Sequence, residues 1–309
     1  AGLGDKYTEY LTEEEYNDLM VDVNGNYVGI GIYMTQDRDE HVVVLLPIEG
    51  SPAEEAGLET GDIITKINGE ECTGMELSLV ANKVKGEEGT TVELEIDREG
   101  KIINKTIERR RVEIYNIKSE VLDGNIGYIQ ILAFNDGCST DFEEKLDELI
   151  SRGVKSLIID VRDNGGGIVN EAINIAELFL PKDKNIMIEL NKNEEEEKII
   201  SKEDAKINSN INVIILSNEN TASASEIFIG ALKDNNIAKI VGTRTFGKGV
   251  MQEIMPMRTG GALKLTIQEF RTPNGNVINE KGIEPDIEIE ENSKTKEDEQ
   301  LQKAIEICK

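Results

Sequence analysis

Histidine is almost absent from this chain: His41 is the only one among 309 residues. A serine or cysteine nucleophile needs a neighbouring base to take its proton, and histidine is the base that enzymes use most often. His41 lies in an alternating, β-rich segment, residues 41–46, where we expect a surface or strand-edge position. If this protein is a serine hydrolase, a lysine is therefore the first candidate for the base.

Cysteine is also scarce, and Cys72, Cys138 and Cys308 are far apart in the sequence with no CxxC pair. An odd number without such pairs excludes a disulfide framework and any obvious zinc site. Cys138 could act as a nucleophile only with His41 as its partner, so we do not expect a cysteine-histidine mechanism.

Basic residues are much fewer than acidic ones: the chain has 34 Lys and Arg and 61 Asp and Glu, which gives a net charge of −27. Such a field repels polyphosphate, so we expect no nucleic-acid partner. Two acidic runs, 194–197 and 297–299, are expected to be solvated faces or loops. A carboxylate metal site is the alternative, but neither run has the Asp-x-Asp-x-Asp-Gly pattern of a calcium loop. We expect no metal and no organic cofactor.

Long apolar runs are missing as well, since no stretch of about 18 or more apolar residues occurs, and nothing is expected to span a membrane. The first seven residues, AGLGDKY, do not have the basic start and apolar block of a signal peptide. The length predicts two domains, because one ordinary core does not comfortably fill 309 residues.

The N-terminal third changes character near residue 26. Residues 1–25 are polar and partly helical, and Thr12 followed by three glutamates predicts a capped helix start. Short strands and helices separated by glycine turns then follow, with strands at 27–33, 42–46, 61–67 and 91–96, and helices at 51–58 and 76–84. We therefore expect a small β-rich module over residues 26–110.

This module resembles a PDZ domain over its whole length. Three motifs carry the resemblance: GIGI at 29–32, SPAEEAGL at 51–58 and GDIITKING at 61–69. In the first motif, glycines let main-chain N–H groups converge on an anion, and the next strand offers an edge to a peptide with a free C-terminus. A small β-fold that uses these glycines only as turns is the alternative. The peptide-binding loop is expected at Gly29, Ile30, Gly31 and Ile32.

Residues 111–292 alternate between buried-type strands and helices, which favours a parallel or mixed sheet covered by helices. Strands are predicted at 125–131, 156–161, 211–216 and 238–242, and helices at 140–152, 170–180 and 222–233. The stretch 184–210 has few apolar residues and is predicted to be a β-excursion or a surface loop. Residues 293–309 are expected to form a charged linker and a short helix.

Ser223 follows the buried strand 211–216 and begins the helix after it. Ligands of α/β sheets bind just beyond the carboxyl ends of such strands, and a helix N-terminus there favours a developing oxyanion. The amide of Ala224 is then a natural oxyanion donor, and the glycine turn 165–167 is a candidate for a second donor. The alternative is that Ser223 only caps the helix, as serines often do.

Three further motifs are similar to those of the carboxy-terminal processing peptidases, also called tail-specific proteases. They are DVRDNGGG at 160–167, TASASE at 221–226 with TFGKGVMQ at 245–252, and KGIEPD at 281–286. The similarity covers nearly the whole chain. It implies an α/β core of ClpP/crotonase-like β-α repeats around a mixed sheet, with an inserted PDZ domain that is β-rich and has two short helices.

The resemblance also implies roles for individual residues. Ser223 would be the nucleophile, Lys248 the general base and Gln252 the residue that orients the lysine. Gly167 and Ala224 would supply the oxyanion amides, with Gly166 as the nearest competitor of Gly167. The implied activity is that of a serine endopeptidase that binds unstructured C-terminal tails through its PDZ domain.

Lys248 must be neutral to act as a base, although an exposed lysine titrates near 10.4. We therefore expect it to be sequestered from water, with apolar cover from Phe246 and Val250, whereas the acidity of the chain favours its charged form. A solvent-facing lysine in a Gly-Lys-Gly turn is the alternative. One departure from relatives concerns the PDZ helix, where Lys85 precedes Gly86 in place of an arginine, which puts ligand gating at that position in doubt.

The resemblance further implies an extracytoplasmic, membrane-anchored bacterial protein whose anchor would precede this chain. It leaves a homodimer and a regulatory partner open. The rival hypothesis is a non-catalytic peptide- or ligand-binding protein on the same fold. Retention of Ser223, Lys248 and Gln252 favours the enzyme, because a binding protein would be free to lose them.

Overall fold

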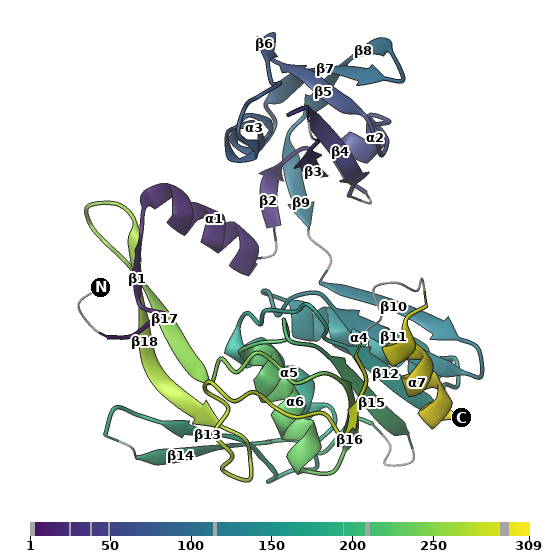
Figure 1. Cartoon of the computed structure of the whole chain (residues 1–309), viewed down its shortest axis with the longest axis vertical. Helices are drawn as coiled ribbons and strands as arrows, with labels where there is room; N and C mark the ends of the chain where they lie inside the picture. The colour runs from purple at the N-terminus through teal and green to yellow at the C-terminus, as the bar shows by residue number, and fades with distance from the viewer. Residues whose placement is uncertain are drawn as a thin grey trace. The chain divides into compact units, whose positions relative to one another are not determined.

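A computed structural model describes residues 4–24, 26–37, 39–48, 50–113, 116–193, 195–207, 211–290 and 297–309. Its contacts divide the chain into two compact units (Figure 1). The small unit comprises Gly25–Ile114, where the sequence predicted a module over 26–110, and the large unit comprises Ala1–Asn24 together with Tyr115–Lys309. None of the helices in these ranges has the length and the apolar character that crossing a bilayer would require.

The small unit is a β-rich domain around its own apolar core. Its main sheet has the order β3-β4-β5-β7-β8, so that β3 is an edge strand, while β6 pairs with β5 and β2 pairs with β9. Two short helices, α2 (Pro52–Glu55) and α3 (Leu77–Val84), complete it, as the resemblance implies. The strands are β2 (Asn26–Gly29), β3 (Ile32–Gln36), β4 (Val42–Pro47), β5 (Ile63–Ile67), β6 (Glu70–Glu71), β7 (Thr91–Arg98), β8 (Lys101–Glu108) and β9 (Arg110–Glu113).

The large unit is built on a mixed sheet with the order β10-β11-β12-β15-β16-β19, in which only the β10–β11 pair is antiparallel. Every residue of β12 is buried, as expected for a strand covered on both faces. The predicted α/β core is therefore confirmed. The strands are β10 (Ile117–Leu122), β11 (Ile126–Ile131), β12 (Ser156–Asp160), β15 (Asn212–Ser217), β16 (Ala238–Gly242) and β19 (Ile287–Glu288).

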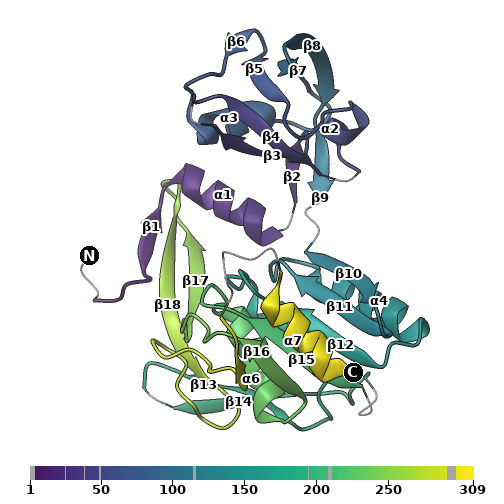
Figure 2. The same ribbon diagram turned by 45° about the vertical axis from the view of Figure 1, so that its right-hand side comes forward.

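Helices cover the two faces of this sheet unequally. One face packs against α4 (Cys138–Ser151), α5 (Val169–Glu177) and α6 (Ala224–Asp234) in the largest apolar cluster of the chain. The other face packs against the C-terminal helix α7 (Glu299–Cys308), which crosses β12 and β15 in Figure 2. Side chains alternate accordingly, since Leu157 and Ile159 of β12 face the first group and Ile158 faces α7.

A second sheet carries the N-terminal strand of the large unit. Its order is β1-β18-β13-β14, and β17 pairs with β18 as well. The hairpin β13–β14 lies within 184–210, so the β-excursion predicted there is correct. The elements are β1 (Glu9–Leu11), α1 (Glu13–Asn24), β13 (Asn185–Leu190), β14 (Glu196–Ile200), β17 (Val250–Pro256) and β18 (Ala262–Arg271).

Two predictions about polar segments can be compared with the described residues. The capped start of α1 is confirmed: the N–H of Thr12 donates to Oε2 of Glu15 at 2.7 Å, and the N–H of Glu15 donates to Oγ1 of Thr12 at 3.2 Å. The solvated acidic run at 297–299 is wrong for Asp298, which caps α7 and contacts Arg162. Glu196 and Glu197 are exposed on β14, and Glu194 lies outside the described residues.

Candidate active site

Ser223 stands between the carboxyl end of β15 and the first residue of α6, as predicted. Its backbone adopts φ 58° and ψ −118°, a positive φ that residues other than glycine rarely adopt. An ordinary N-cap residue is extended, and a non-glycine residue with positive φ is held there by its surroundings at a cost of about 1–3 kcal/mol. Ser223 therefore occupies the N-cap position without the conformation of a simple cap, which favours a functional reason for its placement.

The glycine turn after β12 packs directly on this serine. An ideal Cβ added to Gly166 would lie 2.8 Å from Cβ of Ser223 and 3.0 Å from the nitrogen of Ala224, so no larger residue fits. The two loops are also joined at Asn164, whose main-chain oxygen accepts from the N–H of Ala222 and from Oγ of Ser225, both at 3.0 Å. The loop that carries Ser223, between β15 and α6, and the glycine turn thus form one rigid surface.

The amides of this surface differ in availability. The N–H of Gly166 donates to Oδ1 of Asn164 at 2.9 Å and is therefore committed. Within the described ranges, the N–H groups of Gly167 and Ala224 have no hydrogen-bond acceptor. Gly167 has φ 139°, and a Cβ there would overlap the main-chain oxygen of Phe134. The two amides that the resemblance assigns to the oxyanion, those of Gly167 and Ala224, are therefore free. The amide of Gly166, the alternative to Gly167, is already hydrogen-bonded.

Lys248 precedes β17 and its side chain is partly buried, in the direction that a base would require. Burial lowers its pKa, the nearby Lys264 lowers it further, and Glu9 acts in the opposite direction. The aromatic ring against its amine is that of Tyr7, with Nζ 5.4 Å from the ring centroid. Phe246, which was expected to cover the lysine, is 57% exposed, and that part of the prediction is not supported.

Gln252 lies on β17 and contacts the N-terminal segment. Its Nε2 donates to the main-chain oxygen of Tyr7 at 2.7 Å. In the described part of the chain it makes no hydrogen bond with Lys248, and Oγ of Ser223 makes none with Nζ of Lys248. The expected orienting role of Gln252 therefore stays a prediction, and the structure adds Tyr7 as a neighbour of both residues.

Glu226 is the residue that the sequence analysis quoted without assigning it a role. Its side chain is fully buried, and each oxygen accepts two hydrogen bonds. Oε2 accepts from the N–H groups of Ser223 at 2.9 Å and Lys248 at 2.8 Å, and Oε1 accepts from Oγ1 of Thr245 at 2.5 Å and the N–H of Gly247 at 2.8 Å. Burial raises the pKa of Glu226, whereas these four donors favour its charged form. The Ser-x-x-Glu capping-box pattern was the available signal.

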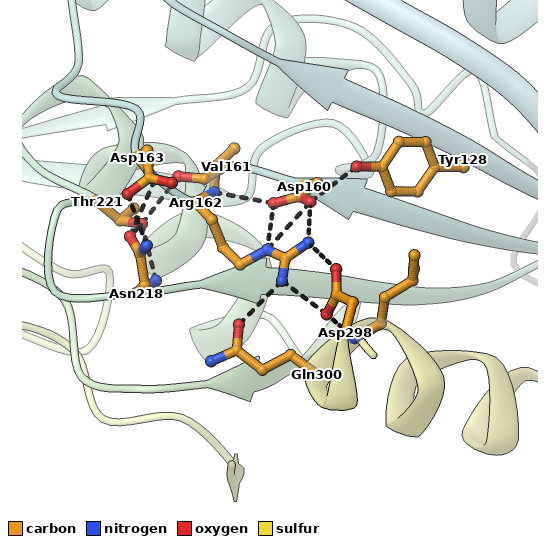
Figure 3. Close-up of polar contacts among 10 residues, drawn as sticks. Tyr128, Asp160, Val161, Arg162, Asp163, Asn218, Thr221, Asp298 and Gln300 are labelled. Carbon is orange, nitrogen blue, oxygen red and sulfur yellow. Dashed lines mark hydrogen bonds and ion pairs between the residues drawn. The ribbon is translucent and has the colours of Figure 1, made fainter. Parts of the chain in front are cut away.

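The segment that leads into the glycine turn is anchored to the C-terminal helix (Figure 3). Arg162 makes a bidentate pair with Asp298, the N-cap of α7, at 2.8 and 2.9 Å, and also binds Asp160 and Gln300. The hydroxyl of Tyr128 donates to the same Asp160 at 2.8 Å. Burial lowers the pKa of Arg162, but its two carboxylate partners, Asp160 and Asp298, raise it, so that the pKa lies above the usual range. These contacts fix the main chain immediately before the turn.

The next residue, Asp163, ties the turn to the loop after β15 (Figure 3). Its Oδ1 accepts from the side-chain amides of Asn218 and Asn220, both at 2.8 Å, and its own N–H donates to Oδ1 of Asn218 at 2.9 Å. These hydrogen bonds keep the pKa of Asp163 below its usual range. They also support its positive φ of 59°.

The remaining candidates for a nucleophile or a base are Cys138 and His41. Burial raises the pKa of the thiol of Cys138, the buried first residue of α4, so it is protonated and unreactive at neutral pH. His41 belongs to the small unit, where a hydrogen bond with Asp37 (Nδ1 to Oδ2, 2.9 Å) raises its pKa. Neither residue takes part in the site around Ser223.

The predicted peptide-binding loop of the small unit joins β2 to the edge strand β3. Gly31 has φ 81°, and a Cβ there would overlap Cβ of Ser51, so only glycine fits. The ring of Tyr27 lies against Gly29 and 5.6 Å below Nζ of Lys85. Burial raises the pKa of Tyr27 to about 12, although the main-chain N–H groups of Ile32 and Gly31 are directed at its hydroxyl and lower it.

Comparisons with known proteins agree with this architecture. The chain is 38% identical over 289 residues to the "Probable CtpA-like serine protease" of Staphylococcus aureus and 37% identical over 288 residues to that of Staphylococcus haemolyticus. Both alignments cover 93% of this chain and 58% of the relative, so the chain spans 58% of the length of the curated relatives it matches.

A solved structure, the photosystem II D1 C-terminal processing protease, aligns over 97% of this chain and 82% of its own, with 28% identity and a TM-score of 0.57. A PDZ-domain model matches residues 43–98, within the small unit. The model of peptidase family S41 matches residues 125–289, which hold the Ser223 and Lys248 loops and the glycine turn. Because this match includes more than half of the chain, the chain belongs to peptidase family S41 and carries a PDZ domain within it.

Proposed function

We propose that this chain is a serine endopeptidase that cleaves peptide bonds through a Ser223–Lys248 dyad. The observation that carries the proposal is the buried carboxylate of Glu226, one oxygen of which binds the main chain of both residues. A fully buried carboxylate is costly unless it is fully hydrogen-bonded, so its placement between these two loops favours a functional arrangement. The curated relatives named as serine proteases support the same activity.

The proposed chemistry begins with neutral Lys248. As Oγ of Ser223 attacks the carbonyl carbon of the scissile bond, Nζ of Lys248 takes the hydroxyl proton, and the carbonyl oxygen becomes an oxyanion. The free N–H groups of Gly167 and Ala224 would stabilise that oxyanion, since a preorganised donor of this kind contributes about 3–4 kcal/mol. The ammonium of Lys248 then gives its proton to the leaving amine, which departs and leaves an acyl ester on Ser223.

Deacylation would follow the same path in reverse order. Lys248, neutral again, takes a proton from water as that water attacks the ester carbonyl, and a second oxyanion forms at the same two amides. Collapse of this intermediate returns the proton from Lys248 to Oγ of Ser223 and releases a carboxylic acid. Gln252, which the family resemblance assigns to orienting Lys248, would hold the amine in line for both transfers.

The PDZ domain would bind the unstructured C-terminal tails of protein substrates. The edge strand β3 is available to pair with an extended peptide, and the loop of Gly29, Ile30, Gly31 and Ile32 would receive its carboxylate. The D1 processing protease is named for processing at a C-terminus, which supports this substrate class for the present chain. On the resemblance alone, we also propose an extracytoplasmic location with a membrane anchor outside this chain, and leave self-association and a regulator to experiment.

The test is hydrolysis of an unfolded protein with a free C-terminal tail, by the wild type beside Ser223→Ala and Lys248→Ala. We expect both variants to lose at least about 10³-fold in kcat, because the nucleophile and its base act as a unit. Lys281→Ala, an exposed lysine outside the dyad, is the matched control and should cleave like the wild type. Equal cleavage by either dyad variant would contradict the mechanism, and tail binding without cleavage by the wild type would favour the non-catalytic binding protein.

A further inference from the structure

Tyr7 reaches the proposed base from the N-terminal segment of the large unit. It immediately precedes the strand pairing of β1 with β18, in which Glu9 lies opposite Lys264. Strand β18 also pairs with β17, so β1 and β17 flank the same strand (Figures 1 and 2). Through this pairing, a residue near the start of the chain comes to lie beside Lys248 and Gln252, more than 240 positions later.

Two contacts connect Tyr7 with the proposed catalytic residues. Nζ of Lys248 lies 5.4 Å from the centroid of its ring, within the range of a cation–π contact. The main-chain oxygen of Tyr7 accepts from Nε2 of Gln252 at 2.7 Å, which fixes the amide of that side chain. The phenol oxygen of Tyr7 is buried and finds no hydrogen-bond partner in the described part of the chain. Its ring and its main chain therefore make the contacts, rather than its hydroxyl.

We propose that Tyr7 is a positioning residue for the general base: its ring shields the amine of Lys248 from water, and its main-chain oxygen holds Gln252 in place. The inference rests on the proposed Ser-Lys mechanism and adds to it a residue that no sequence motif assigns to the site. It makes the N-terminal segment, before β1, a part of the active centre.

The ring of Tyr7 has two opposite effects on Lys248. Its face attracts an ammonium, which favours the charged form of Lys248 and raises its pKa. Its bulk excludes water, and desolvation of a buried lysine lowers the pKa by up to about 3–5 units. Burial is the first of the causes that lower the pKa of Lys248, and we expect the loss of the ring's cover to outweigh the loss of its attraction. Removal of the ring should therefore raise the pKa of the base.

Other charges near Lys248 are few and come from three segments. Lys264 on β18 repels the ammonium, Glu9 on β1 attracts it, and these two form an ion pair of 2.9 Å that largely cancels their fields. Lys6 lies 4.8 Å from the Tyr7 ring but is 55% exposed and so is screened by solvent. Glu226 binds the main-chain N–H of Lys248.

The experiment measures kcat/KM against pH for the full chain and for Tyr7→Ala, Tyr7→Phe and Tyr10→Ala. On the acid side of the profile, kcat/KM falls as Lys248 becomes protonated. In Tyr7→Ala we expect this fall to occur about one pH unit higher, which lowers kcat/KM about ten-fold at more acidic pH values. Tyr7→Phe keeps the ring, so the acid side of its pH profile should match that of the wild type, since the hydroxyl has no hydrogen-bond partner among the described residues. Tyr10→Ala removes an exposed ring on β1 and is the matched control, with the wild-type profile expected.

A second readout does not depend on hydrolysis. In the Ser223→Ala background, the rate at which acetic anhydride acetylates Lys248 is followed by mass spectrometry across pH, with and without Tyr7→Ala. An apparent pKa that rises on loss of the ring supports the proposal even if Tyr7→Ala is too unstable for turnover. The proposal would be overturned if Tyr7→Ala changed neither the apparent pKa of Lys248 from acetylation nor the acid side of the kcat/KM profile. If Lys248→Ala retains full activity, the Ser-Lys mechanism itself has failed, which is a separate outcome.

Discussion

The main-chain N–H groups of Ser223 and Lys248 converge on one atom, Oε2 of Glu226, at 2.9 and 2.8 Å. One hydrogen bond fixes the strained turn at the start of α6, and the other fixes the segment that leads into β17. The distance between the proposed nucleophile and base is thus set by a buried carboxylate that touches neither reacting atom. This places Glu226 among the positioning residues of the site.

Glu226→Gln should separate these two loops without removing either dyad residue. An amide can accept at one oxygen only, so it leaves buried N–H donors facing its NH2 group, at a cost of about 1–3 kcal/mol in the free energy of unfolding. A displacement of the dyad by about 1 Å is expected to lower kcat about 10²-fold while KM changes little. Chemical denaturation and steady-state kinetics measure the two effects.

Glu253→Gln is the control for this prediction, because Glu253 is an exposed residue of β17. It should match the wild type in both stability and kcat. If Glu226→Gln kept the wild-type kcat, the carboxylate would have no role in placing the dyad.

Asp298→Asn should weaken the attachment of the glycine turn to α7. The substitution keeps the shape of the N-cap but removes one charge from the bidentate pair with Arg162, and we expect a loss of about 1–3 kcal/mol in the free energy of unfolding. Burial raises the pKa of Asp298, but the hydrogen bonds from Arg162 outweigh it and the net pKa is lowered. Its stabilising effect is therefore present above its unfolded pKa of about 3.9 and is lost as pH falls through the folded value.

The measurement is the free energy of unfolding of Asp298→Asn and the wild type between pH 3 and pH 8. The difference between them should be largest near neutrality and should shrink toward pH 3. Glu306→Gln, on the same helix, breaks an exposed pair with Lys303 and should cost less than about 0.5 kcal/mol. A pH-independent difference for Asp298→Asn would exclude the charge as its cause.

Gly31→Ala should weaken tail binding by the PDZ domain. The added Cβ would overlap Cβ of Ser51 at a positive φ of 81°, so the loop that presents the main-chain amides must move. Gly69→Ala is the matched control, since Gly69 has φ 80° but open space around its Cβ position. Fluorescence polarisation with a labelled tail peptide should show at least a ten-fold weaker Kd for Gly31→Ala alone. Comparable losses in both variants would point to backbone strain rather than to the loop.

Tyr27→Phe should strengthen tail binding by the same domain. The Tyr27 hydroxyl faces the N–H groups of Ile32 and Gly31, which a peptide carboxylate would need. Removal of the hydroxyl frees these donors, and one hydrogen bond of about 1 kcal/mol corresponds to about five-fold in Kd. Tyr33→Phe, an exposed tyrosine of β3, is the control. A weaker Kd in Tyr27→Phe would show that the hydroxyl assists the ligand instead of competing with it.

Local sequence patterns were sufficient for much of the fold and for part of the site. The strand-turn-helix around Ser223 and the glycine turn after β12 could both be predicted, because apolar strands and helix starts have short-range signatures. Which of the amides of Gly166 and Gly167 is free could not be predicted from the sequence, since it depends on which amide donates to the side chain of Asn164.

The other residues of the site depend on contacts between distant segments. Tyr7 reaches Lys248 only through the register of β1 on β18, and Asp298 reaches Arg162 only because α7 packs across the sheet. The acidic run that contains Asp298 has the composition of a solvated loop, and nothing local indicates its partner. Phe246 was expected to cover Lys248 because it is a sequence neighbour, but the turn directs it outward.

The most direct test of the Ser-Lys mechanism is the intact mass of the protein trapped during turnover of an activated ester of a tail peptide. We predict one acyl adduct per chain, located on the peptide that contains Ser223. This adduct should form at least about 10³-fold more slowly in Lys248→Ala and be absent in Ser223→Ala. An adduct on another residue, or equally fast acylation of Ser223 in Lys248→Ala, would contradict it.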